Sequence, residues 1–590
     1  MSTLVRKRVT QACQPCGIKK RKCDGVYPEC GPCRDKEVCA YGSTKRKVMR
    51  SLDSQSPGSV TPTGARNAET TTSIAQPKAG TPLFASLSSS LKTYLLQTFF
   101  NCIHPLWPVL YKPMYSSLDY ASPVPLLPAA LVSAIFSLTA CVRGLPENED
   151  VKQLYENMPE PSLFFEETLM LLQCGDNGDK NQQPINALKP SITSCQVLFI
   201  LSLQSHSVAE YARAAMLCGL AAAMAIELRL NRPYAGHDSI QIEIRSRLWW
   251  NLFILDKMLS IEMGKPVILR FEDADTPYPS TSEADEFELW MPQVKNELLQ
   301  KQPLKLRTIS VLHTSIELTY IMQMIVTDIY GISARKAIRK DQNVGEVIRM
   351  KIWTDIREWE RKVEASPLKL NLKDRLSSVP GAITNYVILW SATILLHRPF
   401  IERWQSSPAY PDPSVSPHQI CFQAANNICM VFEKHADALP GLPCDTIFAI
   451  FTAASLFLYH LKQNPVDAET RRRLKLCIHW LSILGNSWKS AGARHQILAD
   501  LFDLPKELSV ARPEASLPTN PVLQASTQVP CPNPTMLPPI DYQQSLPQQP
   551  LEGWAFLRDF GDSSDGFFAL DVEFRDLLDG NFDTVENGFL

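Results

Sequence analysis

The stretch CQPCGIKKRKCDGVYPECGPCRDKEVC, residues 13–39, contains six of the sixteen cysteines of this 590-residue chain. They form two halves, each a Cys-x2-Cys pair followed by one more cysteine: Cys13, Cys16, Cys23, Cys30, Cys33 and Cys39. Two such pairs are typical of thiolate metal sites. A structural zinc ion takes four ligands, so six thiolates can serve one zinc with two left over, or two zincs if two sulfurs bridge. The symmetry of the halves favours two bridged zinc ions per chain.

Four consecutive cations lie between the second and third cysteines: Lys19, Lys20, Arg21 and Lys22. Zinc bound at both ends would hold Ile18–Lys22 as a short helix that would fray alone. Such a helix fits the major groove of DNA, and its charges suit phosphates. Residues 1–50 hold thirteen Lys and Arg against four acids, a formal charge of +9, which six thiolates and two Zn²⁺ ions lower by two to +7. We therefore expect a polyanion partner, double-stranded DNA.

The stretch resembles the fungal binuclear zinc-cluster family, whose type member is the yeast galactose activator. The segments that carry the resemblance are Ala12–Cys16, Lys19–Gly25, Tyr27–Cys33 and Cys39–Tyr41. The resemblance implies the following ligand sets: Cys13 and Cys30 bridging both zincs, Cys16 and Cys23 completing one site, and Cys33 and Cys39 completing the other.

The same resemblance implies that Lys20 contacts the bases of a CGG-like triplet, although all four cations could instead touch only phosphates. Two features depart from the family pattern. Gly17 stands where a residue that grips the DNA backbone is usual, and the last cysteine spacing is five residues where six or more is usual. Other interpretations of the cysteines are one zinc with two free thiols, a redox dithiol or a disulfide knot.

Composition divides the chain into six parts. They are a basic arm at 1–12, the cluster at 13–39, a basic then Ser/Thr/Pro-rich linker at 40–89, an all-α domain at 90–510, a Pro/Gln-rich linker at 511–550 and an acidic, aromatic segment at 551–590. The linkers and the acidic segment have too little apolar surface for a core, so we expect them to be disordered.

Apolar residues at helical spacing predict a mostly α fold for the large domain, with almost no strands. The predicted helices are Leu91–Cys102, Ala129–Val142, Ser162–Leu172, Ala209–Leu228, Gln241–Met263, Leu304–Tyr330, Val344–Ala365, Ile383–Trp404, His418–His435 and Thr446–Leu461. Two uncharged apolar runs, Ala214–Ile226 and Ile447–Tyr459, have thirteen residues each. A membrane span needs about 20 residues, so both are expected to be core helices, with no membrane partner.

Three segments look like the regulatory middle region of the same family: Arg247–Trp250, Asp256 with Gly264–Pro266, and Leu396–Phe400. Catalytic and nucleotide-binding motifs such as HExxH, GxxxxGK[ST], GxSxG and GxGxxG are missing from the sequence, so no catalytic residue is predicted and the protein is not expected to be an enzyme. His104 and His397 are expected to be structural, and Trp249 and Trp250 to lie in the core.

Residues 551–590 hold ten acids against two arginines, together with eight aromatic residues. Acidic segments with interleaved rings are typical of activation domains, so coactivators are the expected partners of this tail. No sustained heptads follow the cluster, so any homodimer is expected to form through the middle domain. The sequence thus predicts a nuclear activator of metabolic genes; a repressor or cofactor-recruiting adaptor is the alternative.

Overall fold

The computed structural model describes residues 82–507, with gaps at 124–125, 143–153, 175–188, 291–302, 372–377, 402–415 and 435–444. All of these residues lie in the second of the two units into which the chain divides, residues 76–590. The described part is mostly helical, as the sequence predicts.

The described elements are a series of helices with one pair of short antiparallel strands among them. The first group is α2 (Leu83–Ser86), α3 (Ser89–Thr98), the π-helical η1 (Phe99–Ile103), η2 (Lys112–Tyr115), α4 (Ala129–Thr139), α6 (Pro161–Cys174), α7 (Ile192–Ser207), α8 (Tyr211–Glu227) and α9 (Ser239–Met263). The second is η4 (Phe271–Asp273), η5 (Ala284–Glu286), β1 (Leu289–Trp290), β2 (Leu304–Lys305), α10 (Thr308–Ile325), the π-helical η6 (Val326–Tyr330), α11 (Ile332–Lys340) and α12 (Gln342–Glu364). The third is α13 (Pro380–His397), η7 (Arg398–Phe400), α15 (Pro417–Lys434), α16 (Asp445–Gln463), α17 (Ala468–Leu484) and α18 (Lys489–Glu507).

Local sequence sets both ends of α9, the longest helix of the described part. The Asp238 carboxylate caps its start by accepting from the backbone N–H groups of Ile240 and Gln241. Gly264 ends it in the left-handed conformation, at φ 61°, which glycine adopts without steric strain. The helix predicted as Gln241–Met263 is therefore confirmed to within two residues.

Two predicted helices are wrong at one end. The prediction Leu304–Tyr330 starts too early, because Leu304 and Lys305 pair antiparallel with β1 and Arg307 then turns the chain at a left-handed φ of 54°. The prediction Ile383–Trp404 runs too far. α13 ends at His397, because Pro399 cannot donate to the helical ladder.

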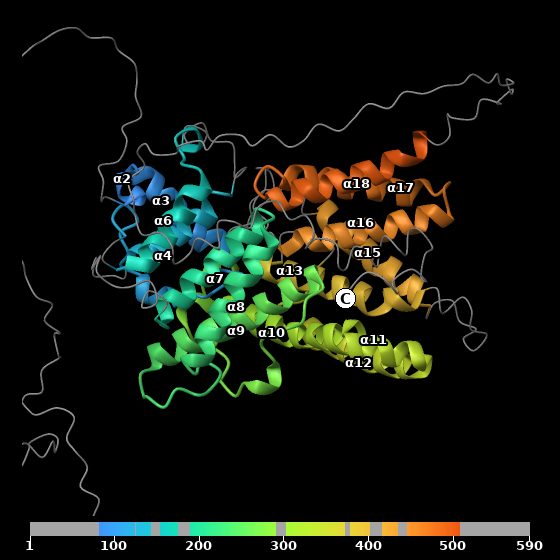
Figure 1. The fold of residues 1–590 in the computed structure, drawn as a ribbon, viewed down its shortest axis with the longest axis horizontal. Coiled ribbons are helices and arrows are strands. Elements are labelled where there is room, and N and C mark those ends of the chain that lie inside the picture. Colours follow the sequence, from blue (N-terminus) through green and yellow to red (C-terminus); the bar gives the residue numbers. More distant parts are fainter. Residues whose placement is uncertain are drawn as a thin grey trace, which may run out of the picture. The chain divides into compact units, whose positions relative to one another are not determined.

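Pairs of neighbouring helices build the domain, and Figure 1 shows how they follow one another. α4 packs on α6, α7 on α8, α13 on α15 and α16 on α17. α13 also contacts α10, α12 and α16, so it lies between the middle and the last helices. Nearly every residue of α13 is buried, which fits this central position.

One helix of the described part, Thr308–Tyr330, is long and apolar enough to cross a membrane by length and composition. However, 56% of its most apolar window is buried inside the protein, and α10 packs against α9, α12 and α13. These contacts are those of a core helix.

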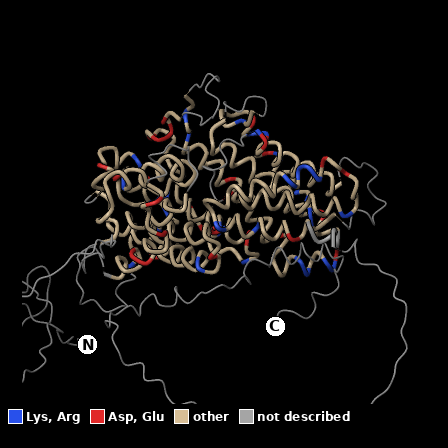
Figure 2. The backbone as a smooth tube through the Cα atoms, turned by 90° about the horizontal axis from the view of Figure 1, so that it is seen from above, with Lys and Arg blue, Asp and Glu red and all other residues tan. Residues whose placement is uncertain are grey.

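Most charged residues lie toward the outside of the described domain (Figure 2), but one buried cluster joins distant helices. Glu262 on α9 accepts from Arg494 on α18 and lies 2.7 Å from the His206 imidazole on α7. Burial raises the pKa of Glu262, but Arg494 and His206 outweigh it and bring that pKa down to about 2. The Glu262 carboxylate therefore stays ionised, and α18 is tied to the middle of the domain.

Asp445, the first residue of α16, is a buried acid whose pKa is raised, unlike that of Glu262. Its carboxylate accepts from the Trp107 indole N–H at 2.9 Å. Burial is the largest influence and raises the pKa of Asp445 from 3.8 to about 6. The ionised carboxylate is therefore less stable in the folded protein than in the unfolded chain.

Replacing this acid, Asp445→Asn, should stabilise the domain more as the pH rises. A raised folded-state pKa means that the penalty for ionisation grows from pH 3.8 to about 6 and is fully present above that. The gain in free energy of unfolding should be about 1 kcal/mol larger at about pH 7.5 than at about pH 5. Urea titrations at the two pH values measure it.

The matched control is Asp341→Asn at the start of α12. The exposed Asp341 carboxylate accepts from the backbone N–H of Asn343 at 2.9 Å, a bond that an asparagine carbonyl can also accept, so any change should be equal at the two pH values. A pH-independent effect of Asp445→Asn would contradict the raised pKa.

Candidate functional site

The residues predicted to bind zinc and DNA, within 13–39, lie outside the described residues, and so does the acidic segment at 551–590. Their roles stay predictions. Among the described residues, no group of three or more His, Cys, Asp or Glu side chains could hold a metal ion. The described part instead shows what the three segments that resemble the family's middle region do.

Arg247 of the first segment is fully buried on α9 and lies between two carboxylates. Its guanidinium donates to Asp285 at 2.5 and 3.1 Å and to Glu243 at 3.0 Å. Burial alone would raise the pKa of Asp285, but its polar neighbours, the Arg247 guanidinium among them, hold it well below its ordinary value. Because Glu243 also accepts from the backbone N–H of Ser280 at 2.7 Å, these bonds fasten the loop before β1 onto α9.

The second segment is a turn that folds back onto the end of α9. The buried Asp256 carboxylate accepts from the backbone N–H groups of Ile268 at 3.0 Å and Leu269 at 2.9 Å. Its neighbour Lys257 donates to Asp256 at 3.0 Å and to the Leu269 carbonyl. Burial lowers the pKa of Lys257 to about 8. Asp256 thus accepts from two backbone N–H groups of the turn that begins at Gly264, and Lys257 donates to a backbone carbonyl of the same turn.

The third segment places His397 at the end of α13, in contact with α12. Its Nδ1 lies 2.6 Å from the Arg349 guanidinium, and its ring meets the Trp353 ring edge-on at 4.8 Å. Burial, with Arg349 as the second cause, lowers the pKa of His397 to about 3. The imidazole is therefore neutral, and Nδ1 accepts from Arg349.

The predicted structural roles of the remaining residues agree with their positions. His104 is buried, its Nε2 lies 3.7 Å from Asp285, and burial lowers its pKa, so it is neutral. Trp249 and Trp250 are both buried, and the Trp250 indole donates to the Pro277 carbonyl at 3.1 Å. These side chains belong to the core and are not arranged as a ligand site.

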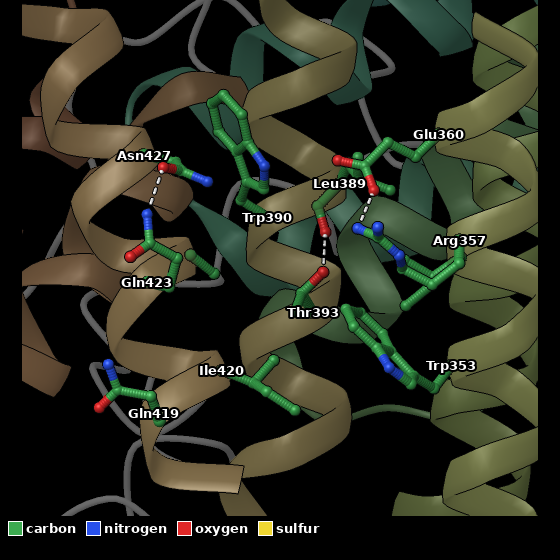
Figure 3. Close-up of a pocket in the computed structure, with 12 residues that line it drawn as sticks. Trp353, Arg357, Glu360, Leu389, Trp390, Thr393, Gln419, Ile420, Gln423 and Asn427 are labelled. Carbon is green, nitrogen blue, oxygen red and sulfur yellow. Dashed lines mark hydrogen bonds and ion pairs between the residues drawn. The ribbon is translucent and has the colours of Figure 1, made fainter. Parts of the chain in front are cut away.

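A pocket with a volume of about 660 Å³ lies between α12, α13 and α15 (Figure 3). We call it the three-helix groove. Leu389, Trp390 and Thr393 of α13 form its floor, with Ile356 of α12 and Ile420 of α15 at the sides. Its volume is within the range of small-molecule sites, about 300–1,000 Å³.

One wall of the three-helix groove is a row of amides on α15. Gln419, Gln423 and Asn427 lie four residues apart, so they share one face of the helix. Figure 3 shows these residues along the α15 side of the groove. The Gln423 side-chain N–H group donates to the Asn427 carbonyl oxygen at 3.0 Å, which leaves further donors and acceptors of these amides for a ligand.

The opposite wall, on α12, carries an aromatic ring and one ion pair. Trp353 lines the groove beside Arg357, whose guanidinium lies 5.7 Å from the ring centroid. Arg357 is paired with Glu360, one turn further along the helix. Burial is the largest influence on Glu360 and raises its pKa even beside this cation.

Sequence reasoning did not find the three-helix groove. The amide row was visible as a four-residue spacing inside the predicted helix His418–His435, but a polar face is ordinarily solvated. Only the packing of α13 against both α12 and α15 brings the amides opposite Trp353. A pattern within one helix carries no information about that pairing.

Comparison with known proteins gives a family match in the middle of the chain. Residues 96–367 match the family described as the fungal specific transcription factor domain. They include the first two segments discussed above and the α12 wall of the three-helix groove, whereas α13 and α15 follow the matched range.

Relatives of known role are transcriptional regulators of fungi. The chain is 26% identical over 441 residues to the acetamidase regulatory protein of Aspergillus fumigatus, covering 72% of this chain and 50% of that protein. It is 23% identical over 359 residues to the nitrogen assimilation transcription factor nit-4 of Neurospora crassa, covering 59% and 31%. It is also 23% identical over 260 residues to cutinase transcription factor 1 alpha of Fusarium vanettenii, covering 41% and 25%. The chain spans half or less of the length of each of these relatives.

Proposed function

We propose that this protein is a sequence-specific, DNA-binding regulator of transcription that acts in the nucleus on metabolic genes. One observation carries the proposal: a six-cysteine stretch with an inserted basic run precedes a fungal specific transcription factor domain in one chain. The names of the relatives, regulators of acetamidase, nitrogen assimilation and cutinase, support metabolic genes as targets.

Zinc is the metal that suits the cluster, because an all-thiolate donor set of this spacing selects it in structural sites. Two zinc ions would be held by Cys13, Cys16, Cys23, Cys30, Cys33 and Cys39. Their contribution would be structural, since a 27-residue module has too small a core to fold without a metal.

The first test is the metal content of the purified full-length chain, by elemental analysis. We expect two zinc ions per chain, and one per chain would contradict the bridged arrangement. Cys30→Ala should lose more zinc than Cys39→Ala, because Cys30 would serve both ions whereas Cys39 would serve one. Equal losses from the two variants would argue against Cys30 as a bridging ligand.

The basic run gives the proposed DNA contact two separable parts. The charge of residues 1–50 would supply affinity for phosphates without regard to sequence. A lysine at position 20 could donate to the O6 and N7 atoms of a guanine in the major groove, which would supply sequence preference.

Lys20→Ala should therefore lose about 1–3 kcal/mol on a CGG-containing duplex and little on a scrambled one. Fluorescence anisotropy with both duplexes at several salt concentrations measures this. Lys19→Ala and Lys22→Ala are the controls; they should weaken both duplexes alike and lower the salt dependence. If Lys20→Ala weakens both duplexes equally, Lys20 does not read bases.

We further propose that residues 551–590 act as an activation segment. The segment holds ten acids and eight aromatic residues; the acids would keep the rings apart and solvated, and so available to a coactivator. If residues 571–582 became helical on contact, Leu570, Phe574, Leu577 and Leu578 would share one face, which suits a hydrophobic groove on a partner.

Fusing residues 551–590 to an unrelated DNA-binding domain tests this role. The fusion should activate a reporter gene, and Phe574→Ala with Leu578→Ala should remove most of the signal. The matched control is Phe556→Ala with Leu557→Ala, which changes the same residue types outside the proposed face. A silent fusion would favour a repressor or an adaptor over an activator.

A further inference from the structure

The three-helix groove is electrically balanced. Its lining contains two charged side chains, Arg357 and Glu360, and these are paired with each other. A cationic ligand would be drawn to Glu360 and an anionic ligand to Arg357. However, each of these side chains is already paired with the other, so neither ligand would find an unpaired counter-charge in the lining. A ligand that enters the groove as an ion would lose hydration without compensation.

Aromatic and aliphatic surface makes up much of the groove. Trp353 and Trp390 come from two different helices, and Trp390 is 7% exposed although it lines the floor. Indole rings bind other planar rings by offset or edge-on stacking. Leu389, Ile356 and Ile420 add aliphatic contacts beside them. The groove therefore favours a planar, largely apolar molecule.

The amide row determines which polar groups such a molecule would carry. Gln419, Gln423 and Asn427 each present a carbonyl acceptor and an NH₂ donor, and one of these donors is used within the row. Amides pair best with groups that likewise both donate and accept, such as another amide or a nitrogen heterocycle. Carboxylates only accept, so they could pair with the amide NH₂ groups but not with the amide carbonyls.

We propose that the three-helix groove binds an uncharged, planar aromatic molecule that carries amide or ring-nitrogen hydrogen-bonding groups. This site goes beyond the proposed DNA-binding function, and its occupancy can be measured without DNA. A failure here therefore leaves the zinc cluster untouched, and a failure of the zinc or DNA experiments leaves this groove untouched.

Two probes with the same ring separate charge from shape: N-acetyltryptophanamide, which is neutral, and N-acetyltryptophan, which is a carboxylate. Titrations of the full-length chain are followed by saturation-transfer NMR of the probe. The neutral amide should bind at least about fivefold more tightly, because the carboxylate would lose part of its hydration without gaining an unpaired counter-charge. Trp353→Ala should abolish the binding of the amide.

The decisive variant is Gln423→Lys, which adds a cation to the exposed amide row and does not disturb the core. It should strengthen binding of the carboxylate by about fivefold relative to the amide, so that the preference for the amide is lost. The matched control is Gln463→Lys, the same substitution at the exposed end of α16, which should leave the preference unchanged.

Three results would overturn the proposal. The first is that the neutral amide does not bind up to its solubility limit. The second is that the two probes bind the unmodified chain equally well. The third is that Gln423→Lys and Gln463→Lys act alike, which would place any binding outside the groove.

Discussion

The arrangement of the described domain depends on the burial of charged side chains along α9. Arg247, Lys257 and Glu262 are each nearly inaccessible to water, so each must find its partner inside the protein. These partners come from different segments: a loop carboxylate for Arg247, a turn carbonyl for Lys257 and the last helix for Glu262. Pairing the buried charges of α9 therefore fixes the positions of the segments that supply their partners.

Much of the fold could be predicted from the sequence, because most helices have one apolar face and clear end signals. The α9 boundaries follow from Asp238 and Gly264. α7 was missed for a physical reason. Every residue from Cys195 to Ser207 is buried, so the sequence of this helix lacks the alternation of apolar and polar residues at helical spacing. The break at Arg307 was also missed, since a left-handed arginine stabilised by surrounding structure has no sequence signal.

The two candidate sites also differ in how far the sequence alone indicates them. The sequence alone supports the predicted cysteine cluster, because its residues are close in sequence and their spacing is typical of thiolate metal sites; it lies outside the described residues. The three-helix groove could not be predicted, because Trp353 and Gln423 are seventy residues apart and meet only through α13. Trp353 also contacts His397, which accepts from Arg349. A molecule in the groove would thus press directly on the buried contacts between α12 and α13.

The buried bond between Trp107 and Asp445 has a consequence for synthesis of the protein. The two residues are separated by 338 positions, and a ribosome adding about 5–20 residues per second needs roughly 20–70 s to cover that distance. During this interval the Trp107 indole lacks its partner, and the surface of α7 that α18 contacts stays open. The nascent chain should therefore depend on chaperones that shield it until its C-terminal helices leave the ribosome.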